Sequence, residues 1–168
     1  MDSPAMPPVA NAVVQTLLDK WVAEGSEIGV HLVAHHGGTC VVDAWAGYQD
    51  RGKPVDPDST LFNVFSVCKA VAATCVHIQA ERGLIEYGAP LARYWPQFIG
   101  DGREQVTVRH VLTHRSGMHK LPADITVEQM CDWGYMVSLL ERTAPAFAPG
   151  SVSGYQSMTF GWLLGEIV

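Results

Sequence analysis

The sequence predicts an α+β fold, in which an antiparallel sheet is flanked by helices and followed by a helical region. Two apolar runs at residues 28–34 and 40–47 are separated by turn-forming residues 35–38, which predicts a β-hairpin. After residue 66, apolar side chains recur mainly at helical spacing. No repeat, low-complexity tract or linker interrupts the 168 residues, so we expect one domain over residues 1–168.

Helices are expected on both sides of the hairpin. Residues 11–24 predict an amphipathic helix, with an apolar face made of Val13, Val14, Leu17, Leu18, Trp21 and Val22. A second helix is expected to begin at Ser66 and to end near the Arg82-Gly83 pair. Further helical patterns cover residues 106–114, residues 126–140 and the chain from residue 159 onward.

The composition favours a globular protein that acts on a small molecule. The chain is 48% hydrophobic and 17% charged, which suits a folded core. Its formal net charge of −6 argues against nucleic acid and against an anionic membrane as partners. No apolar run is long enough to span a bilayer, and the N-terminus lacks the basic and apolar regions of a secretory signal. We therefore expect a cytoplasmic protein.

The sequence predicts neither a metal site nor a cofactor. Without a secretion signal, a C-x-x-C pair or zinc spacing, we expect free, buried thiols at Cys40, Cys68, Cys75 and Cys131. His31 and His35 are four residues apart, as are His110 and His114, but Val111 stands where the zinc motif H-E-x-x-H needs glutamate. P-loop, G-x-G-x-x-G and G-x-S-x-G signatures are absent from the sequence.

The stretch at residues 61–73 carries the strongest chemical signal. An apolar run leads into Ser66, and Lys69 follows three residues later, at the point where the pattern becomes helical. Residues three apart share a helix face, so the Lys69 amine is expected to reach the Ser66 hydroxyl and to help deprotonate it. The alternative interpretation is an ordinary helix start, with Ser66 as the N-cap and Lys69 as a solvated charge.

Two observations favour the activated serine. No other serine in the chain has a lysine three residues later. The helix that follows is expected to be buried, since it is apolar on most faces, with Val67, Ala70, Val71, Ala72, Ala73, Cys75 and Val76. Cys68 is an alternative nucleophile, but it points away from the face that Lys69 shares, so packing is its expected role.

A loop rich in turn residues supplies a second group for proton transfer. Residues 147–157 present Tyr155 just before a helical pattern. A lysine nearby would lower the phenol pKa, so that Tyr155 could accept the serine proton. The alternative is that Tyr155 is a packed aromatic residue.

The hairpin is too small to form a stable sheet alone. Two strands need further strands or a helix to cover them, and no other stretch predicts a convincing strand. The helical pattern also stops at Val168 without a cap. We therefore expect the N-terminal part of a longer protein with an incomplete sheet, or one chain of several. The alternative is a small domain whose hairpin packs on helices.

Four ordered motifs carry a resemblance to a known family. They are residues 61–73 with S-x-x-K, the pattern Glu81-Arg82-Gly83-Leu84-Ile85, the run of residues 106–118, and the stretch from Pro149-Gly150 through Tyr155 to Leu164-Gly165-Glu166. In this order the chain resembles the serine β-lactamase-like family, meaning class C β-lactamases, DD-peptidases and especially family VIII carboxylesterases. The resemblance covers the chain from about Val13 and implies a β-lactamase/transpeptidase-like fold.

The resemblance also implies roles for four residues. Ser66 looks like the acylated nucleophile, Lys69 like its partner and Tyr155 like the general base of a Y-x-N motif. Ser157 stands where that motif has asparagine, which places it at the substrate and favours esters over lactams. The third motif of the family, a Lys/His/Trp-x-Gly strand that gives the second oxyanion N–H, is absent here. This part alone would therefore lack half of its oxyanion hole, an effect of about 3–4 kcal/mol on the barrier.

The expected function is therefore that of a serine hydrolase working through an acyl-enzyme, most readily a carboxylesterase on small esters. β-Lactamase, DD-peptidase and acyltransferase activities are the enzymatic alternatives. A non-catalytic binding module or an inactive part of the fold is the alternative from another class. The expected partners are a small-molecule ester or lactam, together with the missing C-terminal segment or a second chain.

Overall fold

The computed structural model describes residues 8–49 and 52–168, which fall into two compact units. We call Met1–Asn63 the hairpin unit and Val64–Val168 the helical unit, and each is described by itself. The expectation that residues 1–168 form the N-terminal portion of a single domain stays a prediction.

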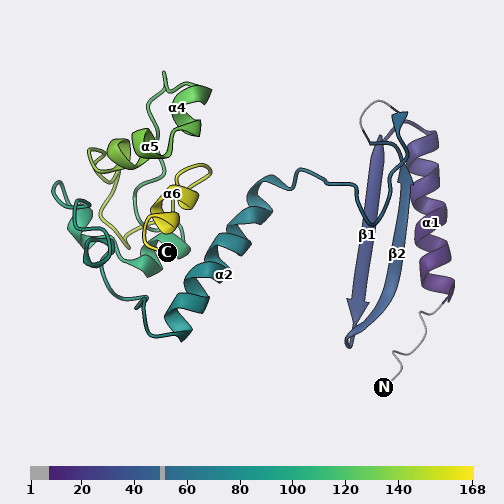
Figure 1. Cartoon of the computed structure of the whole chain (residues 1–168), viewed down its shortest axis with the longest axis horizontal. Coiled ribbons are helices and arrows are strands. Elements are labelled where there is room, and N and C mark those ends of the chain that lie inside the picture. The colour runs from purple at the N-terminus through teal and green to yellow at the C-terminus, as the bar shows by residue number, and fades with distance from the viewer. Residues whose placement is uncertain (1–7, 50–51) are drawn as a thin grey trace. The chain divides into compact units, whose positions relative to one another are not determined.

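The hairpin unit consists of one helix and two strands. These are α1 (Pro8–Ala23), β1 (Gly29–His36) and β2 (Thr39–Gly47), and the strands pair antiparallel (Figure 1). The turn between them is shorter than the predicted residues 35–38. Gly37 and Gly38 have φ of 57° and 81°, and two successive residues with positive φ close a tight two-residue turn. The two histidines before them therefore remain in β1.

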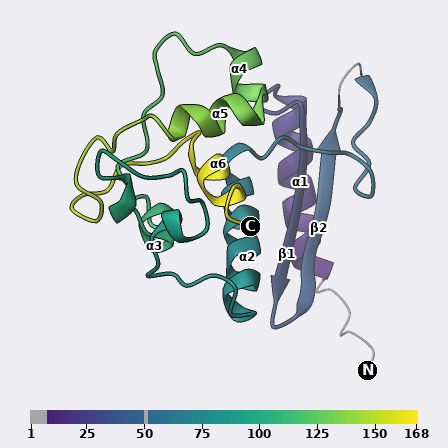
Figure 2. The same ribbon diagram turned by 60° about the vertical axis from the view of Figure 1, so that its left-hand side comes forward.

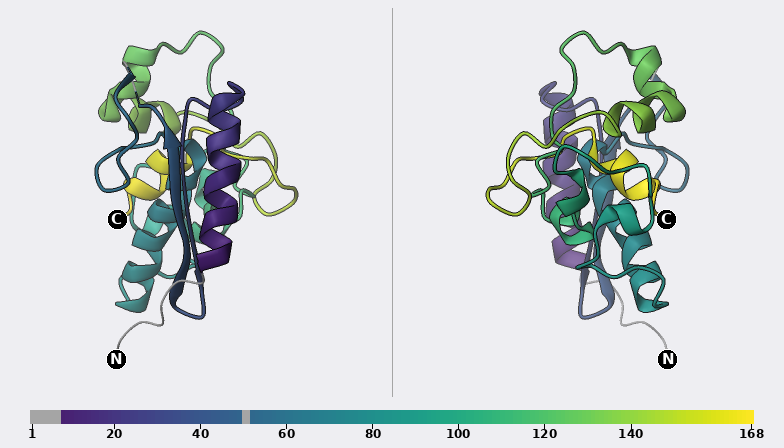
Figure 3. Two further views of the ribbon diagram at one scale, coloured as in Figure 1. Left: turned by 90° about the vertical axis from the view of Figure 1, so that its right-hand side faces the viewer. Right: turned by 90° about the vertical axis from the view of Figure 1, so that its left-hand side faces the viewer.

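Helix α1 covers one face of the hairpin, as the side views in Figure 3 show. The core between them is small and consists of Leu18, Val42, Ala44 and Ala46, with Val14 and Val22 packed against it. The predicted apolar face of α1 is wider than this contact, because Val13 is 64% and Leu17 is 41% exposed. A sheet of two strands is too narrow to cover more than one stripe of the helix.

The helical unit contains five α-helices in its described residues. They are α2 (Cys68–Glu81), α3 (Val108–Leu112), α4 (Val127–Cys131), α5 (Trp133–Leu140) and α6 (Phe160–Gly165), with 3₁₀ turns at Phe65–Val67, Leu91–Arg93 and Arg103–Gln105. Helix α6 packs against α2, α3 and α5 (Figure 2). The core of the helical unit is made of large side chains, including Val76, Leu91, Trp95, Phe98, Val111, Met118, Leu140, Phe160, Leu163 and Leu164.

Polar caps decide where the short helices begin. Thr126 starts α4 in a capping box with Gln129, as the sequence pattern suggests. The single helix predicted over residues 126–140 is wrong, because Asp132 has extended backbone angles and divides it. Its carboxylate accepts a hydrogen bond from the Tyr135 N–H at 3.0 Å, which caps α5 and favours a break over a continuous helix.

Helix α2 is less buried than predicted. Within the helical unit only Val76 of this helix is fully buried, whereas Val71 is 65% exposed. One side of α2 packs on the core of the helical unit. The opposite side is also apolar, but no core residue of the helical unit covers it. The prediction of buried thiols is wrong for the same reason at Cys68 and Cys75, which are exposed. Cys131 is exposed too, and Cys40 is half-buried, although all four thiols are free as expected.

Candidate active site

Ser66 lies in the 3₁₀ turn Phe65–Val67, directly before α2. Neither this turn nor α2 has a side-chain cap, and their N-cap positions are held by Val64 and Val67. The alternative in which Ser66 serves as an N-cap is therefore wrong. Phe65, the residue before the serine, has φ of 42°, a left-handed conformation that is costly for a bulky side chain.

Lys69 contacts Ser66 and the segment that follows Tyr155. Its Nζ donates a hydrogen bond to Ser66 Oγ at 3.1 Å and another to the backbone carbonyl of Ser157 at 2.7 Å. The side chain is half-buried, so the alternative of a freely solvated lysine is wrong as well. The three-residue spacing places the amine beside the hydroxyl, as the sequence predicts.

Tyr155 completes this group of side chains. The Lys69 Nζ lies 5.2 Å from the centre of its ring. A hydrogen bond with the Ser66 side chain has the largest effect and lowers the phenol pKa below its ordinary value of 10.0. Burial opposes this shift, while hydrogen bonding and charge from Lys69 lower the pKa further. Tyr155 is 54% exposed, so it is not the packed aromatic residue of the alternative interpretation. The structure thus brings together the three side chains predicted to carry the chemistry.

Ser157 reaches the same group through its backbone. Its carbonyl oxygen accepts the Lys69 hydrogen bond, while its residue surface remains exposed. The predicted role of Ser157 at the substrate stays a prediction.

The loop that carries Tyr155 is held by the backbone of residues 114–118. The Gly154 N–H donates to the His114 carbonyl at 2.8 Å, and the Ala146 N–H donates to the Gly117 carbonyl at 2.9 Å. At Gly117, with φ of 80°, an added Cβ would lie 2.7 Å from the Phe147 carbonyl oxygen. Glycine is therefore required where the two segments approach.

The sequence predicts no role for His114 beside Tyr155. The spacing offers His114 only as a partner of His110 in a metal site, yet the two rings have different neighbours. His110 Nδ1 accepts from the Thr107 N–H at 3.3 Å in the capping box of α3, whereas His114 lies against Tyr155, with 4.7 Å between ring centres. The available signal was the run of residues 106–118, which is one of the four ordered motifs together with the stretch that contains Tyr155.

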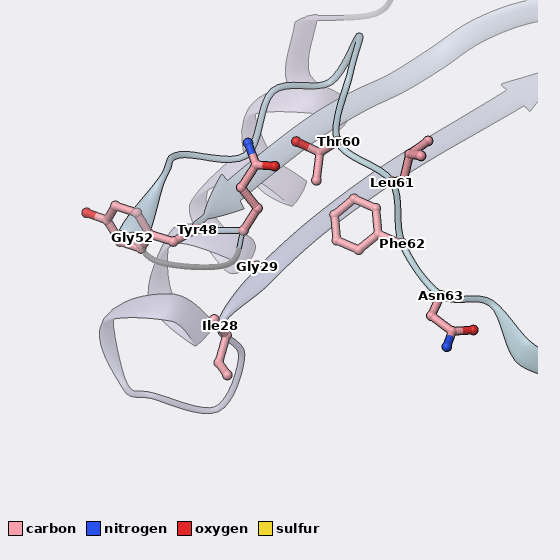
Figure 4. A pocket seen from close by; sticks show the side chains of 9 residues that line it. Ile28, Gly29, Tyr48, Gly52, Thr60, Leu61, Phe62 and Asn63 are labelled. Atoms are coloured by element: carbon pink, nitrogen blue, oxygen red, sulfur yellow. The ribbon is translucent and has the colours of Figure 1, made fainter. Parts of the chain in front are cut away.

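Two other candidates do not join the group. Cys68 is exposed, so the packing role expected for it is wrong. A hollow of about 640 Å³ in the hairpin unit has Tyr48, Thr60 and Phe62 among its lining residues, and none of the predicted site residues lines it (Figure 4).

Across residues 8–49 and 52–168, no three His, Cys, Asp or Glu side chains gather as a metal site would require. No helix in the same residues has the length and apolar character to cross a membrane.

Comparison with known proteins places the chain in a family. The family model described as beta-lactamase matches residues 14–168. The chain belongs to the beta-lactamase family. One relative in this family is the esterase/beta-lactamase LipL of Mycobacterium tuberculosis, which is 39% identical over 141 residues, or 83% of this chain and 32% of LipL.

Solved structures confirm the predicted fold class. A family VIII carboxylesterase matches 99% of this chain and 46% of its own, with a TM-score of 0.84 and 31% identity. A penicillin-binding protein homologue from Caulobacter crescentus matches 99% of this chain and 45% of its own, with a TM-score of 0.85 and 34% identity. The chain thus spans less than half of these structures and about a third of LipL, and its helices and two-stranded sheet correspond to part of the beta-lactamase/transpeptidase-like fold.

Proposed function

We propose that this chain carries the acylating residues of a serine hydrolase that cleaves small esters through an acyl-enzyme on Ser66. The observation that carries the proposal is the arrangement of Ser66, Lys69 and Tyr155, in which Lys69 Nζ lies 3.1 Å from Ser66 Oγ and the pKa of Tyr155 is lowered. A nucleophile in hydrogen-bond reach of a base, which is itself oriented by a third group, is the arrangement that covalent catalysis requires.

In the proposed acylation step, the Tyr155 phenolate takes the proton of Ser66 while Oγ bonds to the ester carbonyl carbon. The carbonyl electron pair moves to oxygen, and its return expels the alkoxide, which takes the proton from Tyr155. Water then attacks the acyl-enzyme, giving its proton to Tyr155, and that proton returns to Ser66 Oγ as the carboxylic acid leaves. Ester and water are consumed, and acid and alcohol are formed.

Lys69 would favour the basic form of Tyr155 in this scheme. Its amine lies beside the Ser66 hydroxyl and the Tyr155 phenol, and a cation close to a phenolate favours the ionised form. Its second hydrogen bond, to the Ser157 carbonyl, fixes the amine between α2 and the Tyr155 loop. Lys69 thus acts as the orienting group and Tyr155 as the base.

An ester is the preferred substrate class for two reasons. Ser157 stands where the lactamase-like pattern has asparagine. One of the relatives is named an esterase/beta-lactamase, and one of the similar structures is a carboxylesterase. β-Lactamase or DD-peptidase activity is the second candidate, favoured by the family itself and by the penicillin-binding protein homologue.

The test is labelling with a fluorophosphonate probe, followed by mass spectrometry of the labelled peptide. In the natural full-length protein we expect one label, on Ser66, and none in the Ser66→Ala variant. Ser26→Ala, an exposed serine in the hairpin unit, is the matched control and should label normally. Absence of label in a folded wild-type protein would support the non-catalytic binding module.

The substrate class is tested separately on the unlabelled full-length protein. We expect hydrolysis of p-nitrophenyl butyrate and none of nitrocefin. Faster turnover of nitrocefin would move the assignment to a β-lactamase. An alkyl butyrate formed after addition of an alcohol would instead identify an acyltransferase.

A further inference from the structure

His114 binds both neighbours of Tyr155 in the chain. Its carbonyl oxygen accepts a hydrogen bond from the Gly154 N–H at 2.8 Å, and its ring Nδ1 accepts one from the Gln156 N–H at 3.2 Å. The backbone on either side of Tyr155 is therefore attached to a single residue about forty positions earlier. Because Gln156 is fully buried, this attachment also fixes the direction in which Tyr155 leaves the loop.

The His114 ring also lies between Tyr155 and helix α6. Its centre is 4.7 Å from the Tyr155 ring and 5.2 Å from the Phe160 ring, with the planes tilted by 57° and 40°. Phe160 belongs to the buried core of the helical unit. The His114 ring thus connects the exposed Tyr155 ring to Phe160, a residue of the buried core.

The backbone of His114 is held in the left-handed region, which residues other than glycine adopt only rarely. Among the described residues, three that are not glycine have positive φ, namely Phe65, Asp101 and His114, with φ of 56° at His114. Two of them adjoin the candidate active site, at Ser66 and at Tyr155. Such conformations are strained and persist where the surrounding structure imposes them.

The hydrogen bond from Gln156 requires a neutral His114 ring. Nδ1 can accept this N–H only without a proton of its own, so the ring proton must sit on Nε2. Burial lowers the pKa of His114 below its ordinary 6.5, and the nearby charge of Lys69 lowers it further. The titratable groups that face the ring are Lys69 from α2 and Tyr155 from the loop.

We propose that His114 is a positioning residue that holds the Tyr155 phenol at Ser66, and that it does so only while its ring is neutral. The inference rests on the proposed function, in which Tyr155 moves the Ser66 proton. On protonation the ring would lose its acceptor for the Gln156 N–H and would face Lys69 as a second cation. Acylation should then fall in acid through residue 114 even though this residue touches no reacting atom.

The experiment separates the side chain from the backbone strain. His114→Gly removes the ring and relaxes the positive φ, whereas His114→Asn keeps an acceptor near the position of Nδ1, tolerates positive φ and does not titrate. Asp101→Gly is the control for backbone strain, because it relaxes another residue of positive φ, at 52°, and it also removes the ion pair between Asp101 and Arg103. Each variant of the natural full-length protein is checked by its melting temperature.

Two readouts are measured as a function of pH. The first is the rate at which the fluorophosphonate probe labels Ser66. We expect His114→Gly to label about 10–100-fold more slowly than wild type, because small displacements of a catalytic group cost this much, and Asp101→Gly to label at the wild-type rate. His114→Asn should keep most of the rate at pH 8, and the additional decline that protonation of His114 causes in the wild-type rate below pH 6.5 should be absent from it.

The second readout is the NMR signal of the two side chains, which needs no activity. We expect the Nε2–H tautomer for His114 and a displaced Tyr155 titration in His114→Gly. Wild-type labelling by His114→Gly, or an unchanged Tyr155 titration in it, would overturn the proposal. If the wild-type protein is not labelled at Ser66, the proposed function is wrong. The His114 tautomer and the Tyr155 titration would still decide whether His114 positions the phenol.

Discussion

The two units of this chain differ in how much of themselves they bury. The hairpin unit has a core of one leucine, one valine and two alanines, at Leu18, Val42, Ala44 and Ala46. The helical unit buries large side chains from four helices (α2, α3, α5 and α6) and the connecting turns, with Trp95 stacked on Phe98 at 4.7 Å between ring centres. The stabilising free energy of apolar burial grows with the area removed from water. The helical unit therefore contributes most of this stabilisation.

This difference explains where a precise site can be built. All three candidate catalytic side chains and His114 belong to the helical unit. Ser66 is placed by α2, which packs through Val76, and Tyr155 is placed by the segment before α6, which packs through Phe160. A catalytic arrangement needs support from packed elements, and in this chain the hairpin unit lacks a core of that size.

The largest expected effect is the loss of a core side chain in the helical unit. Phe98→Ala should reduce the free energy of unfolding by about 3–5 kcal/mol, because it leaves a large cavity beside Trp95. Leu18→Ala in the hairpin unit should cost about 2 kcal/mol, since the small side chains around it can close in. Native-state hydrogen exchange, read for each unit, measures both. Equal losses in the two units would contradict the comparison.

A second prediction concerns two tyrosines of similar exposure, one in each unit. Tyr155→Phe should lower kcat/KM for an ester about 100-fold or more, because the proton acceptor for Ser66 is lost. Tyr48→Phe, at 52% exposure in the hairpin unit against 54% for Tyr155, is the control and should not change it. Steady-state kinetics at pH 8 measures the ratio. A Tyr155→Phe enzyme with normal kcat/KM would remove Tyr155 from the mechanism.

Acid should affect the helical unit before the hairpin unit. His114 has a pKa lowered from 6.5, so the unfolded chain binds its proton first, and stability falls as the pH drops below 6.5 toward the folded pKa. Asp56 has a pKa lowered from 3.8, chiefly by a hydrogen bond from the Ser59 hydroxyl at 2.6 Å, so its contribution is present above pH 3.8 and is lost as the pH falls through the folded pKa.

The measurement is an NMR titration of amide signals near each group. We expect the Gln156 amide to begin to change as the pH falls below 6.5, and the Thr60 amide, which donates to the Asp56 carbonyl, to change only below pH 4. His114→Asn should abolish the first change alone. A Thr60 change in the same window as Gln156 would show that the two units respond together.

The smallest expected effect is at the surface of the hairpin unit. Leu61 is 96% exposed, so Leu61→Gln should change the free energy of unfolding by less than about 0.5 kcal/mol. Urea denaturation is sufficient to detect a larger change. A loss above 1 kcal/mol would mean that Leu61 is covered in the natural protein. The buried apolar area of the hairpin unit would then be larger than its four core residues indicate.

The sequence was enough to predict the features that depend on local spacing. Ser66 and Lys69 meet because three residues along a helix return to the same face, and the two glycines of the hairpin turn predict its sharp reversal. The fold class followed from four motifs in a fixed order, and the comparisons confirm it.

The features that could not be predicted depend on residues far apart in the chain. The exposure of Val71 depends on what the rest of the helical unit covers, which periodicity does not reveal. The break at Asp132 reflects competition between its side-chain cap and a continuous helix, and the sequence pattern suits both. His114 acquires its place from a positive φ and from contacts with residues 154–160, neither of which has a local signature.

The hydrogen bond from Lys69 to the Ser157 carbonyl joins residues 88 positions apart. Closing a segment of that length costs entropy that only the completed core of the helical unit repays, so α2 can form long before the amine finds this acceptor. Acquisition of reactivity at Ser66 during refolding should therefore coincide with the last tertiary step rather than with helix formation.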